Sequence, residues 1–174
     1  MVKDRTCCFS GHRPEKMPFA ANANSYAFQQ FHNALTRTVY DAIHSGYNHF
    51  ITGMSRGMDL WAAQEVIAYR EAYPELVLEA AVPFLGQESL WSEQDQALYN
   101  AVREACDSVV ILSPEHRPNV MHQRNRYMVD RSSLLIAAYD GTAGGTRYTV
   151  EYARSRGLQI INLFETDYFD YTIL

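Results

Sequence analysis

The sequence predicts a Rossmann-like α/β fold, in which an open, mostly parallel sheet of about six strands carries helices on both faces. Short apolar runs alternate with segments of helical periodicity, and the connections between them are short. Several runs are apolar at successive positions, as expected for strands that are covered on both faces. Right-handed crossovers place the helices on both sides. Because no composition break or repeat divides the chain, we predict one domain over residues 1–174.

The expected elements follow in order along the chain. The short apolar runs predict strands at Thr6–Ser10, His49–Gly53, Leu76–Pro83, Ser108–Ser113, Ser133–Tyr139 and Leu158–Asn162. Apolar residues at helical spacing predict helices at Tyr26–His44, Asp59–Tyr73, Glu88–Ala105, Val120–Arg131 and Thr146–Arg156. The last segment, residues 165–174, is aromatic and acidic, and it fits either a final strand or a docked tail.

Composition and charge exclude several classes of function. Apolar residues make up 47% of the chain, charged residues 20%, and the formal net charge is -5, which is typical of a soluble domain and unfavourable for general binding of nucleic acid backbones. No apolar stretch approaches the roughly 20 residues of a membrane span. An odd number of cysteines, without CxxC or zinc spacing, predicts reduced thiols in a cytoplasmic protein and no metal site. The many aromatic residues are compatible with a homo-oligomer.

Three of the predicted strands run into loops that are suited to binding an anion. Glycine lets a ligand approach the backbone, and the start of the following helix directs N–H groups and the positive end of its dipole at a phosphate. Arginine adds a planar fork that can donate two parallel hydrogen bonds. The candidate ligand-binding residues in these loops are Ser10, Gly11, His12, Arg13, Thr52, Gly53, Arg56, Gly57, Asp59, Asp140, Gly141, Gly144, Gly145, Thr146 and Thr149.

Each of these residues also has a structural explanation. Glycine serves tight turns and close packing of helix on strand, and Asp59, Thr146 or Thr149 can cap a helix. A lone histidine such as His12 is usually structural, but this one follows a strand at the edge of the sheet where ligands bind. We favour a ligand site because three such loops converge. Neither a Walker loop nor a GxGxxG fingerprint is present.

Two further segments can add side chains to the same cleft. Pro83 and Phe84 follow the third predicted strand, and the Phe84 ring could stack on a base. Arg124 lies on the helix before the fifth strand, close to Tyr127 and Met128 at helical spacing. We expect Arg124 to face the cleft and contact phosphate.

Several motifs in their order along the chain resemble the YpsA-like family of the SLOG superfamily. The resemblance extends from about Cys8 to Asn162 and rests on SGHRP, TGMSRGMDLWAA, PFxGQxxxWxxxD, RNRYMVDRS and DGTAGGTRYTVEYA. It implies a Rossmann-like sheet and a nucleotide-derived ligand at the glycine loops. The superfamily is similar to the LOG phosphoribohydrolases and to the Rossmann domain of DNA-processing protein A.

Comparison with the phosphoribohydrolases separates the binding residues from the catalytic ones. Their MHxRK and PGGxGTxxE motifs supply a catalytic arginine and a catalytic glutamate. Arg124 matches the arginine, which makes it a candidate catalytic residue, but Asn125 replaces the usual lysine and Thr149 stands at the glutamate position. A threonine cannot carry the charge that stabilises an oxocarbenium-like state. Asp140 is the first candidate to supply a carboxylate instead, and the other two candidates are Asp59 and Asp95.

Three functions remain open. The first is binding of a nucleotide-derived small molecule by a sensor or accessory module, with weak or no catalysis. The second is an N-glycosidic hydrolase that acts on a nucleotide or on an NAD- or ADP-ribose-type compound. The third is a partner in DNA processing, which the net charge of -5 disfavours. No cofactor follows from the sequence other than the nucleotide-like ligand itself.

Overall fold

A single sheet of six parallel strands, in the order β4-β3-β2-β1-β5-β6, organises the chain. The computed structural model describes residues 3–173. Its strands are β1 (Thr6–Gly11), β2 (His49–Thr52), β3 (Val77–Val82), β4 (Ser108–Ile111), β5 (Leu134–Ala138) and β6 (Gln159–Asn162). The predicted fold class is confirmed, and each strand lies where the apolar runs place it. The strand order reverses between β1 and β5, which is the place where open α/β sheets bind ligands.

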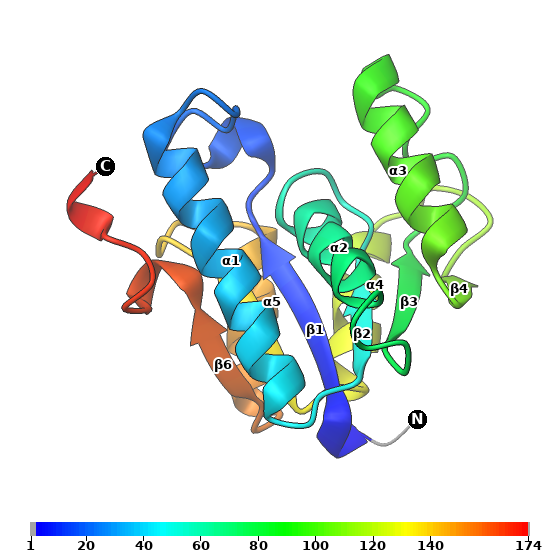
Figure 1. Cartoon of the computed structure of the whole chain (residues 1–174). Helices are drawn as coiled ribbons and strands as arrows, with labels where there is room; N and C mark the ends of the chain where they lie inside the picture. Colours follow the sequence, from blue (N-terminus) through cyan, green and yellow to red (C-terminus); the bar gives the residue numbers. More distant parts are fainter. Residues whose placement is uncertain (1–2, 174) are drawn as a thin grey trace.

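Helices cover both faces of this sheet (Figure 1). The five α-helices are α1 (Tyr26–His44), α2 (Met58–Tyr69), α3 (Glu93–Ala105), α4 (Val120–Asp130) and α5 (Gly145–Ser155). The helices α1 and α2 pack together on one face with α3 beside α2, and α4 packs against α5 on the other. Within residues 3–173, no helix is long and apolar enough to cross a membrane.

The third helix begins later than the apolar spacing predicts. We expected it to start at Glu88, but Ser92 has an extended backbone and its hydroxyl accepts a hydrogen bond from the Asp95 N–H at 3.2 Å. This N-cap fixes the start of α3. Trp91 therefore lies in the preceding turn, where its ring packs edge-on against Tyr99 with centroids 5.6 Å apart.

The second helix ends earlier than expected, at Tyr69 instead of Tyr73. Pro74 follows closely, and a proline disfavours helical backbone in the residue before it. Residues 70–76 form turns that lead toward β3, and Arg70 donates hydrogen bonds to the carbonyls of Leu76 and Ala105. These contacts replace the last helical turn that the sequence suggests.

The sheet divides the apolar core into two parts. Cys7 and Cys8 are neighbours on β1, and their side chains belong to different parts: Cys7 packs under α1 and α2, and Cys8 packs under α4 and α5. Both thiols are fully buried, and burial raises the pKa of Cys8 to about 12. The cysteines are therefore apolar core residues and form no disulfide, consistent with the predicted reduced state.

The chain after β6 forms a docked tail and not a seventh strand. Its two short 3-10 helices, Leu163–Glu165 and Tyr171–Ile173, run beside the start of α1 (Figure 1). The rings of Phe164 and Phe169 are buried and lie within 6.5 Å of Phe31 on α1. This settles the alternative for residues 165–173, and Leu174 lies outside the described residues.

A buried carboxylate on β3 gives the first testable prediction. Glu79 accepts hydrogen bonds from Tyr127 Oη at 2.7 Å and, with the proton on that nitrogen, from His49 Nε2 at 3.1 Å. The bond from His49 outweighs burial and lowers the pKa of Glu79 below its usual 4.5. A lowered pKa stabilises the fold at pH values above 4.5, and this contribution is lost as the pH falls through the folded-state pKa.

We expect Glu79→Gln to cost on the order of 1–3 kcal/mol of unfolding free energy at pH 7, because two buried donors lose a charged acceptor. The difference from wild type should shrink as the pH is lowered to about 4, since wild type then loses the same contribution. Denaturant unfolding at both pH values measures it, with the exposed Glu104→Gln on α3 as control. If the difference in unfolding free energy between wild type and Glu79→Gln stays the same from pH 7 to about pH 4, the lowered pKa of Glu79 is not the cause of the loss.

Candidate functional site

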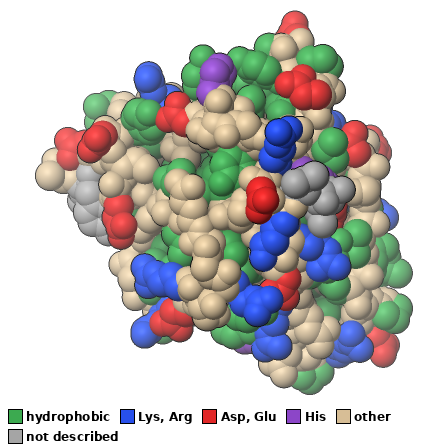
Figure 2. Space-filling model, turned by 90° about the horizontal axis from the view of Figure 1, so that it is seen from below, with side chains coloured by type: hydrophobic (Ala, Val, Ile, Leu, Met, Phe, Trp, Pro, Cys, Tyr) green, Lys and Arg blue, Asp and Glu red, His purple; other side chains and the backbone are tan. Residues whose placement is uncertain are grey.

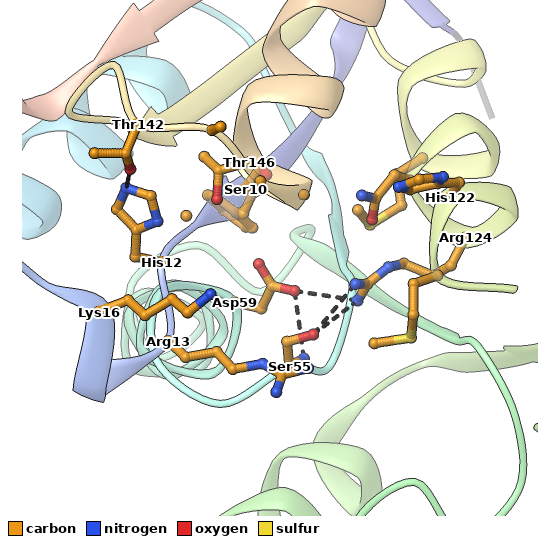
Figure 3. A pocket seen from close by; sticks show the side chains of 18 of the residues that line it. Ser10, His12, Arg13, Lys16, Ser55, Asp59, His122, Arg124, Thr142 and Thr146 are labelled. Carbon is orange, nitrogen blue, oxygen red and sulfur yellow. Dashed lines mark hydrogen bonds and ion pairs between the residues drawn. The ribbon is translucent and has the colours of Figure 1, made fainter. Parts of the chain in front are cut away.

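A pocket of about 330 Å³ opens at the carboxyl ends of β1 and β5, where the strand order reverses. The loop after β1, the start of α5, one face of α4 and the β2–α2 loop form its walls (Figure 3). The predicted residues that line it are Ser10, Gly11, His12, Arg13, Asp59, Arg124, Gly144, Gly145 and Thr146. The structure thus brings residues from all three predicted loops to one cavity.

The start of α5 faces this pocket without a side-chain cap. Gly144 is the N-cap residue, and no side chain among the described residues accepts a hydrogen bond from the first turn. A Cβ built on Gly145 would have no protein atom within 4 Å. The Thr149 hydroxyl, which could have capped the helix, instead donates to the Gly145 carbonyl at 2.9 Å. The first N–H groups of α5 are therefore available to an acceptor in the pocket.

A buried ion pair forms the opposite wall. Arg124 Nη1 lies 3.3 Å from Asp59 Oδ2, and both residues are 5% exposed. The guanidinium also donates to the Gly53 carbonyl and to Ser55 Oγ. The dashed lines of Figure 3 join Arg124 to Asp59 and to Ser55. Burial raises the pKa of Asp59 although the charge of Arg124 opposes this rise. Arg124 lines the pocket as predicted, but the protein already occupies most of its donors.

One donor of this arginine is left over. Arg124 Nε is buried and has no hydrogen-bond partner within residues 3–173. Buried N–H groups are nearly always paired, either with protein atoms or with water or ligand atoms. The orphaned Nε marks a place where the wall of the pocket is incomplete without a further acceptor.

Three of the predicted glycines are explained by packing within the protein. A Cβ on Gly11 would meet Met58 Cβ at 2.5 Å, and a Cβ on Gly53 would meet Asp59 Oδ2 at 2.6 Å. Gly57 has a φ of +85°, which favours glycine. These glycines let α2 approach the sheet and let Arg124 lie against the backbone. Only the α5 loop combines open glycines with the pocket.

Cations lie on the side of the pocket that the β1–α1 loop supplies. Arg13 and Lys16 line it, and Figure 3 shows both side chains reaching from this loop toward Asp59 and Ser55. Lys16 was not predicted, although it lies only two residues beyond the SGHRP motif. These two cations and the α5 N-terminus make the cavity suited to an anion.

His12 and Asp140 form a hydrogen-bonded pair at the rim. His12 Nε2 lies 2.8 Å from Asp140 Oδ1, and the Thr142 N–H and hydroxyl donate to the same oxygen at 3.0 and 2.7 Å. Burial raises the pKa of Asp140, but the bonds from Thr142 and His12 outweigh it and lower this pKa to about 2. Asp140 does not itself line the pocket; its carboxylate binds His12 and Thr142.

The remaining predicted residues lie outside the cavity. They are Thr52, Gly53, Arg56, Gly57, Pro83, Phe84, Asp140, Gly141 and Thr149. Arg56 forms ion pairs with Glu15 at 2.7 Å and Asp95 at 3.4 Å, and the Phe84 ring packs edge-on against His116. The side chains of both residues are therefore engaged by other parts of the protein.

Sequence reasoning missed several lining residues. Ser55, Glu15, Thr142 and Ala143 lie inside or beside the predicted loops, so counting every residue of each loop would have found them. Met121, His122 and Asn125 lie with Arg124 on the side of α4 that faces the pocket, and only the position of α4 in the fold identifies them. Within the described residues, no group of three or more His, Cys, Asp or Glu side chains is arranged to hold a metal ion.

The fold and the site define a Rossmann-like α/β protein with an anion-suited pocket at the switch point of its sheet. The YpsA family model, described as the YspA SLOG family, matches residues 7–164. The chain therefore belongs to this family.

Curated relatives agree with this assignment, and a solved structure resembles the fold. A UPF0398 protein of Halalkalibacterium halodurans is 32% identical over 129 residues, 72% of this chain and 68% of that protein. One of Bacillus cereus strain B4264 is 27% identical over 151 residues, 85% of this chain and 82% of that protein. The fold resembles the DNA processing protein A of Streptococcus pneumoniae, with a TM-score of 0.59 and 16% identity over 91% of this chain. The chain spans half of that structure's length.

Proposed function

We propose that the pocket binds a nucleotide-derived small molecule and that a phosphate group of this ligand sits at the start of α5. The observation that carries the proposal is the uncapped helix start, where Gly144 and Gly145 leave open space on the pocket side. Helix N-termini with free N–H groups bind phosphate in many Rossmann-like proteins. Arg13 and Lys16 supply the positive charge from the facing loop.

The size and position of the pocket support the same proposal. Its volume of about 330 Å³ lies at the lower end of the range for small-molecule sites, roughly 300–1,000 Å³. The resemblance to SLOG proteins implies a nucleotide-derived ligand at these loops, and the family is the one to which the chain belongs. We therefore assign the role of a sensor or accessory module that binds such a ligand.

Catalysis by the phosphoribohydrolase route has less support. Thr149, at the position of the catalytic glutamate, is fully buried and does not line the pocket. Protein groups already bind all three carboxylates named as substitutes: Asp140 binds His12, Asp59 binds Arg124 in the pocket wall, and Asp95 binds Arg56. An N-glycosidic hydrolase needs a carboxylate free to face the sugar, so we propose binding rather than turnover.

A role as a DNA-processing partner has less support. Figure 2 views the end of the molecule at which the strands begin, opposite the pocket, and shows acidic side chains interspersed among the basic ones. A continuous basic stripe, which a nucleic-acid backbone requires, does not stand out on this face. The likeness to DNA processing protein A is a likeness of fold.

Gly145→Val tests the proposed site. A valine side chain would enter the open space beside the α5 start, so we expect at least a tenfold loss of affinity for ribonucleoside 5′-monophosphates measured by calorimetry. Native mass spectrometry of protein taken directly from cells should show a co-purified ligand on wild type and its loss in the variant. The stability should change little, because no protein atom lies within 4 Å of the new Cβ.

Arg154→Val is the matched control, because it introduces the same residue at an exposed position of the same helix. It should bind like wild type. Equal affinity of wild type and Gly145→Val for every ligand that binds would place the site elsewhere.

A further inference from the structure

His12 is held so that only one of its ring nitrogens is free. It follows β1 directly, is 7% exposed and lines the pocket. Nε2 is committed to Asp140 Oδ1 at 2.8 Å, with Thr142 Oγ1 at 3.5 Å. No hydrogen bond to Nδ1 is present within residues 3–173. Figure 3 shows the Nε2 side of the ring turned to Thr142 and the other ring nitrogen turned toward the interior of the pocket.

The partner of Nε2 fixes the tautomer. Asp140 Oδ1 accepts three hydrogen bonds, from the Thr142 N–H, the Thr142 hydroxyl and His12. A carboxylate with three such donors remains ionised at neutral pH. An ionised carboxylate can only accept, so the proton of a neutral imidazole lies on Nε2. Nδ1 is then an unprotonated acceptor that faces the ligand space.

His12 Nδ1 faces the ligand space beside several donors. The α5 N–H groups, Arg13 and Lys16 are donors, which suit phosphate. Asp59 Oδ2 already accepts from Arg124 and from the Ser55 N–H, and Glu15 accepts from Arg56. His12 Nδ1 has no such protein partner within residues 3–173, so a ligand group that pairs with it has to be a hydrogen-bond donor.

From this arrangement we infer that His12 Nδ1 accepts a hydrogen bond from a sugar hydroxyl of the ligand and so selects ribonucleotides over analogues without that hydroxyl. Asp140 acts as the positioning residue, because it fixes the ring and its tautomer. The inference rests on the proposed function, since it assumes that the phosphate lies at the start of α5. Beyond the phosphate site, it names the sugar hydroxyl as the part of the ligand that the pocket recognises.

The test compares ribonucleoside 5′-monophosphates with their 2′,3′-dideoxy counterparts by calorimetry. Wild type should bind the ribonucleotides about tenfold more tightly, which corresponds to roughly 1.4 kcal/mol. In His12→Ala and Asp140→Ala, the ratio of the two affinities should fall toward one. Thermal unfolding followed by circular dichroism checks that each variant is folded.

Two conservative variants separate selection from a structural role. His12→Gln can keep a donor near the place of Nε2, facing Asp140, but has no acceptor at the place of Nδ1. His12→Asn can put its amide oxygen near the place of Nδ1 but cannot reach Asp140. We expect His12→Gln to lose the preference and His12→Asn to keep part of it. A purely structural His12 would give the reverse order and would overturn the inference.

The two proposals fail in different ways. If ribonucleotides bind to wild type and the dideoxy compounds bind equally well, the inference about His12 is wrong and the proposed function stands. If Gly145→Val leaves nucleotide binding unchanged, or if no ribonucleoside 5′-monophosphate binds to wild type, the proposed site fails and the inference fails with it.

Discussion

Replacing Arg124 by alanine is expected to lower the free energy of unfolding by about 3–5 kcal/mol, the cost of leaving one member of a buried ion pair without its partner. Arg124 and Asp59 are each 5% exposed, and their charged groups lie 3.3 Å apart. The same guanidinium donates to the Gly53 carbonyl and to Ser55 Oγ. The substitution thus leaves a carboxylate, a carbonyl and a hydroxyl in the wall of the pocket without this hydrogen-bond donor.

The pH dependence of this loss identifies its cause. Burial already raises the pKa of Asp59, and removing the positive charge of Arg124 raises it further. A folded-state pKa above the unfolded value of 3.8 makes the fold most stable below that value, and stability is lost as the pH rises through the folded pKa. Arg124→Ala should therefore be less destabilised near pH 4 than at pH 7, as measured by denaturant unfolding.

Two companion variants complete this test. Arg124→Ala combined with Asp59→Asn should recover part of the lost stability at pH 7, because the stranded charge is gone. Arg126→Ala, two residues along α4, removes an exposed arginine and should change the stability little. A loss of the same size for Arg124→Ala at both pH values would show that Asp59 is not the group left unpaired.

The arrangement of the strands could be predicted because it depends on local patterns. The apolar runs at β1, β2 and β5 are buried at nearly every position, as a parallel sheet covered on both faces requires. The helix boundaries were less predictable. A hydrophobic period continues through residues 88–92, and only the extended backbone and capping hydroxyl of Ser92 stop α3 there.

The candidate site was predictable as a place and less so as a set of side chains. The position of the loops after β1 and β5 follows from topology, and the pocket lies there. Which cationic side chain lines the pocket does not follow from its neighbours in sequence. Arg56 sits in a glycine loop but binds Glu15 and Asp95, whereas Lys16, outside the recognised motif, lines the cavity.

Glycine illustrates the same limit. Gly53 and Gly145 both follow strands and both fitted a ligand loop. A Cβ on Gly53 would strike Asp59 and Arg124, whereas a Cβ on Gly145 would enter open space. The first is a packing requirement within the protein and the second is room beside a helix N-terminus. Only the three-dimensional neighbours separate the two roles.

Phe31→Ala is the second substitution for which we expect a loss of about 3–5 kcal/mol of unfolding free energy. Phe31 is fully buried on α1, and its ring lies within 6.5 Å of the rings of Phe19, Trp61, Phe164 and Phe169. Truncation leaves a cavity among rigid aromatic rings that come from four separate segments. These rings cannot collapse together without moving the loop before α1 and the C-terminal tail.

The position of this cluster connects stability to the pocket. Phe19 belongs to the loop between β1 and α1, which also carries Arg13 and Lys16, and Phe169 belongs to the docked tail. Phe31→Ala should therefore expose the tail to limited proteolysis and weaken nucleotide binding in addition to lowering the denaturant midpoint. Tyr26→Ala, at a position 64% exposed on the same helix, should cost less than about 0.5 kcal/mol and leave both readouts unchanged. If Phe31→Ala is destabilising but the tail stays protected and binding is intact, then α1 is stabilised by the cluster while the loop and the tail are positioned independently of it.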